Sequence, residues 1–453
     1  MSVVKIIGAG LAGCEAAWQA AKLGVEVLLY EMKPHKLTPA HHTPGFAELV
    51  CSNSLRSNQL SNAVGLLKAE LSHMDSLIME AALATAVPAG SALAVNREEF
   101  SSYITKKINE HPLITVISEE VCELDCDSET VTVVATGPLT SDAMAEAIQR
   151  ITGGNELHFY DAAAPIVDFS TVNTDVAFFA SRYGKGDPTD YLNCPMTKEQ
   201  YDVFYNALVT AEVAKLKSFD SDSQSDLTVF EGCMPVEVMA SRGYDTLRFG
   251  PMKPVGLPLP STGEDAFATV QLRRENREGT MYNLVGFQTH LTFGEQKKVF
   301  RLIPGLEKAE FHRYGVMHRN TYLNSPGMLT PSFAMKEHPR IFFAGQMTGV
   351  EGYVESASSG FVAGVNAALS ALGKESFIFP AETEIGALAH YVSNGGVSSS
   401  FQPMNANFGI IAPLDKKVKG GKKHRNEVYS ERSLEIIGTL KNALNELRNE
   451  NTY

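Results

Sequence analysis

The chain has 453 residues, 44% of them hydrophobic and 20% charged, with a formal net charge of −13. This length suits two or three domains around a sizeable core, and no apolar run approaches the ~18 residues that a membrane span needs. The acidic balance argues weakly against nucleic acid, because phosphate contacts need Lys and Arg, but basic stretches at residues 273–277 and 416–425 keep that question open.

The first thirty residues predict one βαβ unit. Residues 3–7 form a short β-branched apolar run, residues 11–22 an alanine-rich helix, and residues 25–30 a second strand. The chain opens directly on this strand pattern rather than on a basic segment followed by an apolar one, which is not the pattern of a signal peptide. Six scattered cysteines show no disulfide rhythm, so we expect a cytoplasmic protein with reduced thiols.

The rest of the chain indicates a discontinuous architecture. Residues 34–62 are irregular and rich in Pro, His, Ser and Asn, which is typical of a functional loop. The pattern predicts a first domain segment at residues 1–190, an inserted mixed α/β domain at 191–326, and a return to the first domain at 327–453 with a basic tail. The remaining predicted elements are a helix at 63–86, a strand at 131–135, a helix at 141–151, strand-like runs at 267–272 and 282–287, a strand at 341–344, and helices at 358–372 and 430–448.

A dinucleotide fingerprint stands between the first strand and the first helix. Gly8, Gly10 and Gly13 fit G-x-G-x-x-G, and Glu31 follows Gly10 by 21 positions at the end of the second strand. Gly8 permits the tight turn, Gly10 lets the backbone approach a pyrophosphate, and Gly13 lets helix and strand pack closely. The helix start at Leu11 and Ala12 would offer free N–H groups to the phosphates, and Glu31 would bind the ribose.

A second glycine-rich element near the other end of the chain decides between FAD and NAD. A strand ends in Gly345 and Gln346, and Gly352 precedes a small-residue helix containing Ser359 and Gly360. Such an element resembles the one that large flavoproteins place against the flavin, and the turn at Thr136 and Gly137 resembles their mid-chain Ala-Thr-Gly turn. Together with the fingerprint these features favour FAD.

Several longer stretches resemble the folate- and FAD-dependent tRNA (uracil-5-)-methyltransferase family. They are CSNSLRSNQLSNAVGLLKAE, FEGCMPVE, GFQTHLTFGEQKKVF, VMHRNTYLNSP and FFAGQMTGVEGYVESASSGFVAG. The resemblance implies an α/β fold with a discontinuous, glutathione-reductase-like FAD-binding Rossmann domain and an insertion domain. It also implies transfer of a methylene group from methylenetetrahydrofolate to uracil C5 in the T-loop of tRNA, with NAD(P)H recharging the flavin.

Two cysteines in turn-like, polar contexts suit that chemistry. Uracil C5 becomes nucleophilic when a thiolate adds to C6, and a base must then remove the C5 proton. By resemblance, Cys233 is the nucleophile and Cys51 the proton acceptor or an auxiliary thiol, although the sequence alone would also allow the reverse. Cys14, Cys122 and Cys126 are interpreted as small buried hydrophobes, and Cys194 is left unassigned.

Other polar residues have weaker assignments. His290 is a candidate for stacking on the folate pterin, with a hydrogen-bonded core histidine as the equal alternative. His35, His41 and His42 have no acidic or Cys partners at ligand spacing, so no metal site is predicted. With no second G-x-G-x-x-G, NAD(P)H is expected to dock transiently on the flavin. Candidate anion contacts, each by default a surface salt bridge, are Arg56, Arg97, Arg242, Arg248, Arg273 and Arg274.

Three alternatives remain open at this stage. The chain could be the related FAD enzyme that installs carboxymethylaminomethyl groups on wobble uridines, which usually carries a longer C-terminal helical region. It could methylate a ribosomal RNA uridine by the same chemistry. It could also be a flavin-stabilised RNA-binding protein without enzymatic activity, which would leave two turn-placed cysteines without a purpose.

Overall fold

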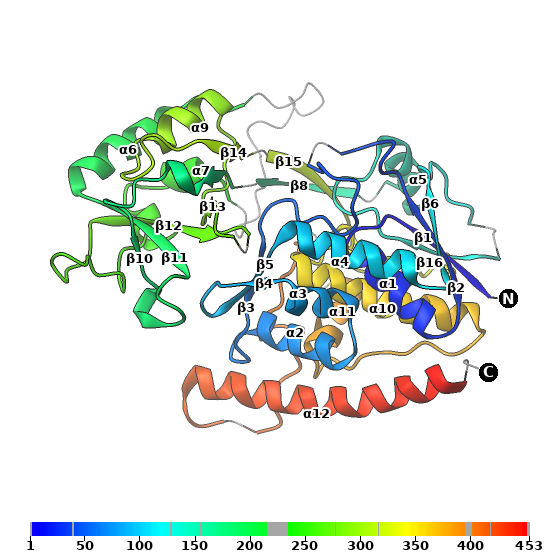
Figure 1. Cartoon of the computed structure of the whole chain (residues 1–453). Helices are drawn as coiled ribbons and strands as arrows, with labels where there is room; N and C mark the ends of the chain where they lie inside the picture. Colours follow the sequence, from blue (N-terminus) through cyan, green and yellow to red (C-terminus); the bar gives the residue numbers. More distant parts are fainter. Residues whose placement is uncertain are drawn as a thin grey trace.

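The computed structural model of the chain describes residues 2–38, 40–126, 129–154, 156–162, 164–214, 234–276, 278–315, 317–394, 401–416 and 418–450, without side chains at 156–162 and 317–321. Cys233 lies outside the described residues. Figure 1 shows two lobes, with the green middle of the chain in one and both ends of the chain in the other. Among the described helices, none has the combined length and apolar character of a membrane span.

The larger lobe is built on a five-stranded parallel sheet. Its order is β16-β7-β1-β2-β6, so a strand from residue 341 onward pairs with strands from the first 134 residues. Buried β-branched residues dominate these strands, as expected for a sheet covered on both faces. The predicted strands at 3–7, 25–30, 131–135 and 341–344 are confirmed within one residue at each end. The five strands are β1 (Val3–Ile7), β2 (Glu26–Glu31), β6 (Ile114–Ser118), β7 (Val131–Val134) and β16 (Ile341–Phe343).

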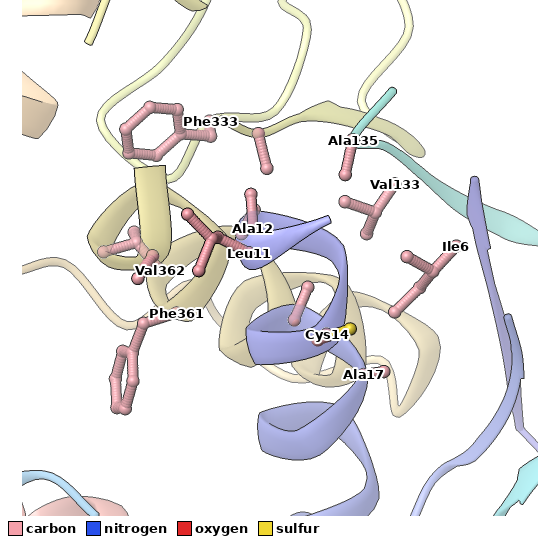
Figure 2. Close-up of a cluster of buried hydrophobic side chains, with 14 of the residues drawn as sticks. Ile6, Leu11, Ala12, Cys14, Ala17, Val133, Ala135, Phe333, Phe361 and Val362 are labelled. Carbon is pink, nitrogen blue, oxygen red and sulfur yellow. The ribbon is translucent and has the colours of Figure 1, made fainter. Parts of the chain in front are cut away.

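Helix α1 (Leu11–Lys22) packs between this sheet and helix α10 (Tyr353–Ala371), which is almost entirely buried. Figure 2 shows Cys14 on the side of α1 toward Ile6, and Val362 of α10 beside Leu11. The two helices approach closely because α10 presents glycines. A Cβ at Gly360 would lie 2.2 Å from the Ala12 carbonyl oxygen, and one at Gly364 would lie 2.5 Å from the Ala16 Cα.

This contact predicts opposite effects for two Gly→Ala substitutions. Gly364→Ala should lower the free energy of unfolding by about 1–3 kcal/mol, because its methyl group meets backbone that cannot move aside. Gly438→Ala, in helix α12 (Gly421–Glu450), has nothing within 4 Å of its Cβ. It should raise the stability by roughly 0.5–1 kcal/mol through helix propensity. Chemical denaturation of both variants checks this pair, and equal stabilities would contradict the close helix contact.

The single helix predicted at 63–86 is wrong, because the structure has two helices there. Helix α2 (Ala63–His73) ends before Asp75, which adopts a left-handed φ of +62°, and α3 (Leu77–Ala84) starts with Ser76 as its cap. The Asp75 region receives contacts from distant segments, including Gln19 Nε2 to the Asp75 carbonyl oxygen at 3.2 Å and Lys441 Nζ to its carboxylate at 2.9 Å. These tertiary contacts stabilise a turn that the local pattern does not show.

The remaining elements of the larger lobe surround this core. Helix α12 crosses beneath α2 and α11, as Figure 1 shows, and begins nine residues earlier than predicted. A small three-stranded sheet, in the order β3-β5-β4, includes a strand within residues 34–62, so the expectation that this whole range is irregular is wrong. The elements are β3 (Ser54–Ser57), β4 (Ala86–Val87), β5 (Ala92–Val95), α4 (Arg97–Glu110), α5 (Asp142–Thr152), α11 (Glu384–Asn394) and the 3-10 turn η5 (Gln346–Thr348).

The smaller lobe has its own sheet and its own hydrophobic core, drawn from residues 167–309. The sheet order is β10-β11-β12-β13-β9-β14, and the two-stranded ribbon β8–β15 lies between the lobes in Figure 1. Strands β9 and β10 come before residue 191, and the other four strands of this sheet begin at or after it. The domain boundary predicted between residues 190 and 191 therefore divides one sheet. The elements are β8 (Glu156–Ala162), β9 (Ile166–Asp168), η1 (Phe169–Thr171), β10 (Phe178–Phe179), η2 (Arg182–Gly184), β11 (Tyr191–Met196), α6 (Lys198–Thr210), α7 (Val236–Ser241), α8 (Thr246–Phe249), β12 (Ala268–Arg274), β13 (Met281–Leu284), α9 (Phe293–Phe300), β14 (Phe311–Arg313) and β15 (Met317–Leu323).

Candidate functional site

A cleft of about 1130 Å³ opens where the parallel strands of the larger lobe end at their carboxyl edge. This edge is where open α/β sheets bind their ligands. The cleft draws its walls from both ends of the chain, because residues after β1, β2, β7 and β16 meet there. The predicted site residues that line it are Gly8, Gly10, Leu11, Ala12, Glu31, Thr136, Gly137, Gly345 and Gln346.

The three fingerprint glycines occupy different environments. Gly8 has a φ of +99°, and a Cβ there would lie 2.6 Å from the Ala135 carbonyl oxygen. A Cβ at Gly13 would lie 1.8 Å from the Gly8 carbonyl oxygen, so both positions need glycine for the fold itself. Gly10 has an ordinary φ of −76°, and nothing lies within 4 Å of its Cβ position. The fold does not require glycine at position 10, but a ligand close to the backbone would.

Glu31 is held at the rim of the glycine loop. Its carboxylate accepts hydrogen bonds from the Ala9 amide at 2.8 Å and the Lys33 amide at 3.0 Å. These two amides fix the carboxylate at the end of β2, where it lines the cleft although only 7% of the residue is exposed. A hydroxyl-bearing ligand in the cleft would find a preorganised acceptor at this point.

Four further predicted residues do not line the cleft but support it. Ser359 Oγ accepts a hydrogen bond from the Gly345 amide at 2.7 Å and thereby fixes the turn after β16. Gly13 and Gly360 permit the close packing of α1, and Gly352 starts α10 with a φ of +125°. Direct contact of these four residues with a cofactor stays a prediction.

The sequence analysis missed several residues of the cleft wall. Most lie within residues 31–50, where the sequence indicated a functional loop but not which side chains serve the site. The pKa of His41 is lowered by burial and by Lys33, and its Nδ1 lies 2.6 Å from Thr38 Oγ1. The neutral imidazole is therefore a polar, uncharged part of the wall. The missed residues include Lys33, Thr38, His41, Glu48, Val50 and Tyr353.

Cys51 stands at the edge of this cleft, directly after Val50 of its wall. The Tyr353 hydroxyl accepts hydrogen bonds from the Cys51 amide at 2.8 Å and the Ser52 amide at 3.2 Å, and it lies 3.0 Å from Cys51 Sγ. Burial raises the pKa of Tyr353 well above its usual value, so the phenol stays neutral. The first residue of α10 thus fixes the thiol beside the cleft from 302 positions away.

The loop after Cys51 is also bound to the smaller lobe. Arg273 of β12 donates to Ser52 Oγ at 2.9 Å and to Asn53 Oδ1 at 3.2 Å. The side-chain Nδ2 of Asn53 donates in return to the Arg274 carbonyl oxygen at 2.9 Å. Arg97 of α4 forms an ion pair with Glu275 and donates to the Leu49 carbonyl oxygen. These largely buried contacts hold the two lobes together immediately beside Cys51.

His290 lies in the smaller lobe, outside the wall of the cleft. Its amide donates to Glu237 Oε1 at 2.7 Å, and the Val236 amide donates to the Gln288 carbonyl oxygen at 2.7 Å. Burial lowers the pKa of His290, which favours a neutral ring. The residues that follow Cys233 in the chain are therefore anchored to the segment that carries His290. The roles predicted for Cys233 and His290 themselves stay predictions.

The structure corrects several secondary assignments. Cys14 is buried as expected and Cys194 is buried in the second core, but Cys122 is exposed and Cys126 half-buried, so the interpretation of the latter two as buried hydrophobes is wrong. They follow β6 in irregular backbone, where Cys126 packs at the edge of the core of the larger lobe and Cys122 is exposed. Arg97 and Arg273 belong to the buried lobe junction and are not surface salt bridges. Within the described ranges, no group of three or more His, Cys, Asp or Glu side chains could hold a metal ion.

A Rossmann-type cleft, completed by a late strand and helix and flanked by a thiol at a lobe junction, defines a dinucleotide-binding α/β protein with a second lobe that has its own sheet and core. The family model described as "Glucose inhibited division protein A" matches residues 3–375. The chain is 58% identical over 434 residues to the methylenetetrahydrofolate–tRNA-(uracil-5-)-methyltransferase TrmFO of Acetivibrio thermocellus, covering 96% of this chain and 97% of that protein. It is 56% identical to the TrmFO of Bacillus subtilis, covering 96% and 98%.

A solved structure shares the fold at much lower identity. The structure of Aquifex aeolicus GidA in its form II crystal superposes with a TM-score of 0.71 at 17% identity, covering 99% of this chain and 75% of that one. This likeness supports the architecture and nothing more. From the family model and the close relatives, the chain belongs to the methylenetetrahydrofolate–tRNA-(uracil-5-)-methyltransferase family.

Proposed function

We propose that this chain transfers a one-carbon unit from methylenetetrahydrofolate to C5 of the T-loop uridine of tRNA, in the cytoplasm, with FAD as cofactor and NAD(P)H as reductant. The names of relatives that share more than half of its residues support the reaction. The observation in the structure that carries it is Cys51, fixed at the mouth of a dinucleotide cleft and at the junction with the smaller lobe, whose core includes Val236, three residues after Cys233 in the sequence.

The cleft fits FAD. Gly10 leaves the space that a Cβ would fill open to a pyrophosphate, Glu31 presents a fixed carboxylate to a ribose, and Gly345 and Gln346 close the other end. Helix α1 starts at Leu11, so its free N–H groups and dipole favour the phosphates there. When bound, the flavin would supply the hydride that reduces the transferred methylene to a methyl group.

The residues of the chain have separate tasks in this proposal. The Cys233 thiolate adds to uracil C6, which makes C5 nucleophilic toward the methylene carbon. Cys51, held by Tyr353 and by the junction with Arg273, accepts the C5 proton. Loss of this proton is coupled to cleavage of the bond between the methylene carbon and its carrier, which departs and leaves an exocyclic methylene group on C5. Hydride addition to that methylene then forms the methyl group and expels the Cys233 thiolate from C6, which restores the C5–C6 double bond. The neutral His290 ring offers a flat surface on which the folate pterin can stack.

The decisive experiment is a product analysis with purified protein. Methylenetetrahydrofolate labelled in its methylene carbon, unmodified tRNA and either NADPH or NADH are combined, and the nucleosides are then separated. The expected result is labelled 5-methyluridine from the T-loop, absent when folate or reductant is omitted. A parallel reaction contains ribosomal RNA. Label only in ribosomal RNA, a change only at the wobble uridine, or no labelled nucleoside at all would refute the proposed function.

A further inference from the structure

Helix α12 begins in a concentration of positive charge that contrasts with the net charge of −13 for the whole chain. Between residues 413 and 426 the sequence has one acidic residue, Asp415. The cationic side chains are fully on the surface, and that of Lys423 is 81% exposed. We refer to this set as the basic start of α12, and it consists of Lys416, Lys419, Lys422, Lys423 and Arg425.

Ion pairs between the described residues use little of this charge. Among the described ion pairs, Lys423 contacts Glu427 at 3.9 Å, and none involves Lys416, Lys419, Lys422 or Arg425. The first turn of α12 also contains no acidic residue. Cations at a helix N-terminus oppose the helix dipole, most strongly at low salt. Their placement therefore destabilises the free helix slightly, and an external polyanion would remove that cost.

The basic start of α12 is attached to the segment that carries Cys51. Asn426 Nδ2 donates to the Ser61 carbonyl oxygen at 3.0 Å, and Ser430 Oγ donates to the Leu60 carbonyl oxygen at 2.7 Å. The same segment is fixed from inside by Lys68, whose Nζ donates to the Leu55, Arg56 and Ser57 carbonyl oxygens at 2.8, 3.1 and 2.6 Å. Helix α12 is thus fixed, near its N-terminal end, to the segment that follows Cys51.

The separation from Cys51 is bounded by the chain. Nine residues lead from Cys51 to Leu60, which span at most about 32 Å when fully extended. Arg425 precedes Ser430 by five helical residues, which adds roughly 8 Å. With the hydrogen bond between Ser430 and Leu60 included, the backbone of Arg425 therefore lies within about 50 Å of the backbone of Cys51 by these limits. A structured RNA whose modified loop reaches Cys51 also has backbone phosphates at such distances from the thiol. Their charge density is high, since duplex DNA carries one negative charge per ~1.7 Å of its axis.

We propose that the basic start of α12 binds the sugar-phosphate backbone of the tRNA substrate outside the modified loop, without reading its sequence. This inference rests on the proposed function for the identity of the RNA. Long, exposed cationic side chains, spread here over the first residues of α12 and the segment before it, suit phosphate contacts rather than base recognition. The surface supplies a salt-dependent part of the affinity and holds the RNA while its loop enters the site.

The test is the salt dependence of tRNA binding by the triple variant Lys422→Gln/Lys423→Gln/Arg425→Gln. We expect the dissociation constant for unmodified tRNA to rise at least ~10-fold near physiological salt, and the slope of log K against log salt to fall by about 2–3. A matched control, Lys106→Gln/Lys308→Gln/Lys336→Gln, changes net charge equally at exposed positions elsewhere in the chain. Flavin content and NADPH oxidation should stay unchanged in both variants.

A second variant guards against disruption of the helix. Lys416→Gln/Lys419→Gln changes residues that precede α12 and cannot unfold it, and we expect a slope reduction of about 1–2. Equal binding by the test variants and the control would overturn the inference, even if wild-type protein methylates tRNA. The inference would also be overturned if the test variants bound phosphatidylserine vesicles more weakly than wild-type protein does but bound tRNA equally well. If wild-type protein binds tRNA through this surface but forms no 5-methyluridine, the proposed function fails and the RNA surface stands.

Discussion

Gly10→Val is expected to give a folded protein that purifies without FAD. The backbone at Gly10 is extended, with a φ of −76°, and nothing lies within 4 Å of the Cβ position, so valine fits the protein itself. Its methyl groups would instead project into the cleft where the pyrophosphate must approach the helix start. We expect the dissociation constant for FAD to rise by at least ~100-fold, equivalent to about 2.7 kcal/mol.

The measurement combines flavin absorbance of the purified variant, titration with FAD, and thermal unfolding of the apoprotein beside wild-type apoprotein. Gly10→Ala should show a smaller loss of affinity. Gly13→Val serves as the structural contrast, because a Cβ there would lie 1.8 Å from the Gly8 carbonyl oxygen and the variant should not fold. Undiminished FAD binding by Gly10→Val would show that the pyrophosphate does not lie against this helix start.

The difference between these glycines also shows how far a sequence motif can be interpreted. The βαβ unit could be predicted because its period, its glycines and the acidic residue 21 positions after Gly10 are all local in the sequence. The motif could not distinguish glycines that serve the ligand from glycines that serve packing. Gly360 resembled a flavin contact, yet its missing Cβ makes room for the Ala12 backbone.

The part of the site that could not be predicted depends on contacts between distant segments. Tyr353 reaches Cys51 across 302 positions, and Arg273 reaches Ser52 across 221. Neither pair leaves a periodic or spaced signal, since only the assembled sheet brings the two ends of the chain together. The same reason accounts for the break at Asp75, where side chains of α1 and α12 stabilise a turn inside a helical pattern.

Cys233→Ala should abolish methyl transfer while FAD remains bound. Without a thiolate at C6, uracil C5 cannot attack the methylene carbon, and removal of a catalytic nucleophile commonly costs more than ~10³-fold in rate. The measurement is 5-methyluridine formation at saturating folate and NADPH, together with flavin content and NADPH oxidation, which should not change. Cys194→Ala is the matched control, because it removes a thiol of the smaller lobe that is buried in the core.

A C5-fluorinated uridine in the T-loop separates the roles of the two cysteines. Fluorine cannot leave as a proton does, so the adduct at C6 should accumulate on the nucleophile and survive denaturation. Cys51→Ala should retain this adduct and lose turnover, because its task follows the addition, whereas Cys233→Ala should form no adduct. Adduct formation by Cys233→Ala but not by Cys51→Ala would reverse the two roles. Full turnover by Cys233→Ala would remove the thiol from the mechanism and leave only a flavoprotein whose cleft borders Cys51.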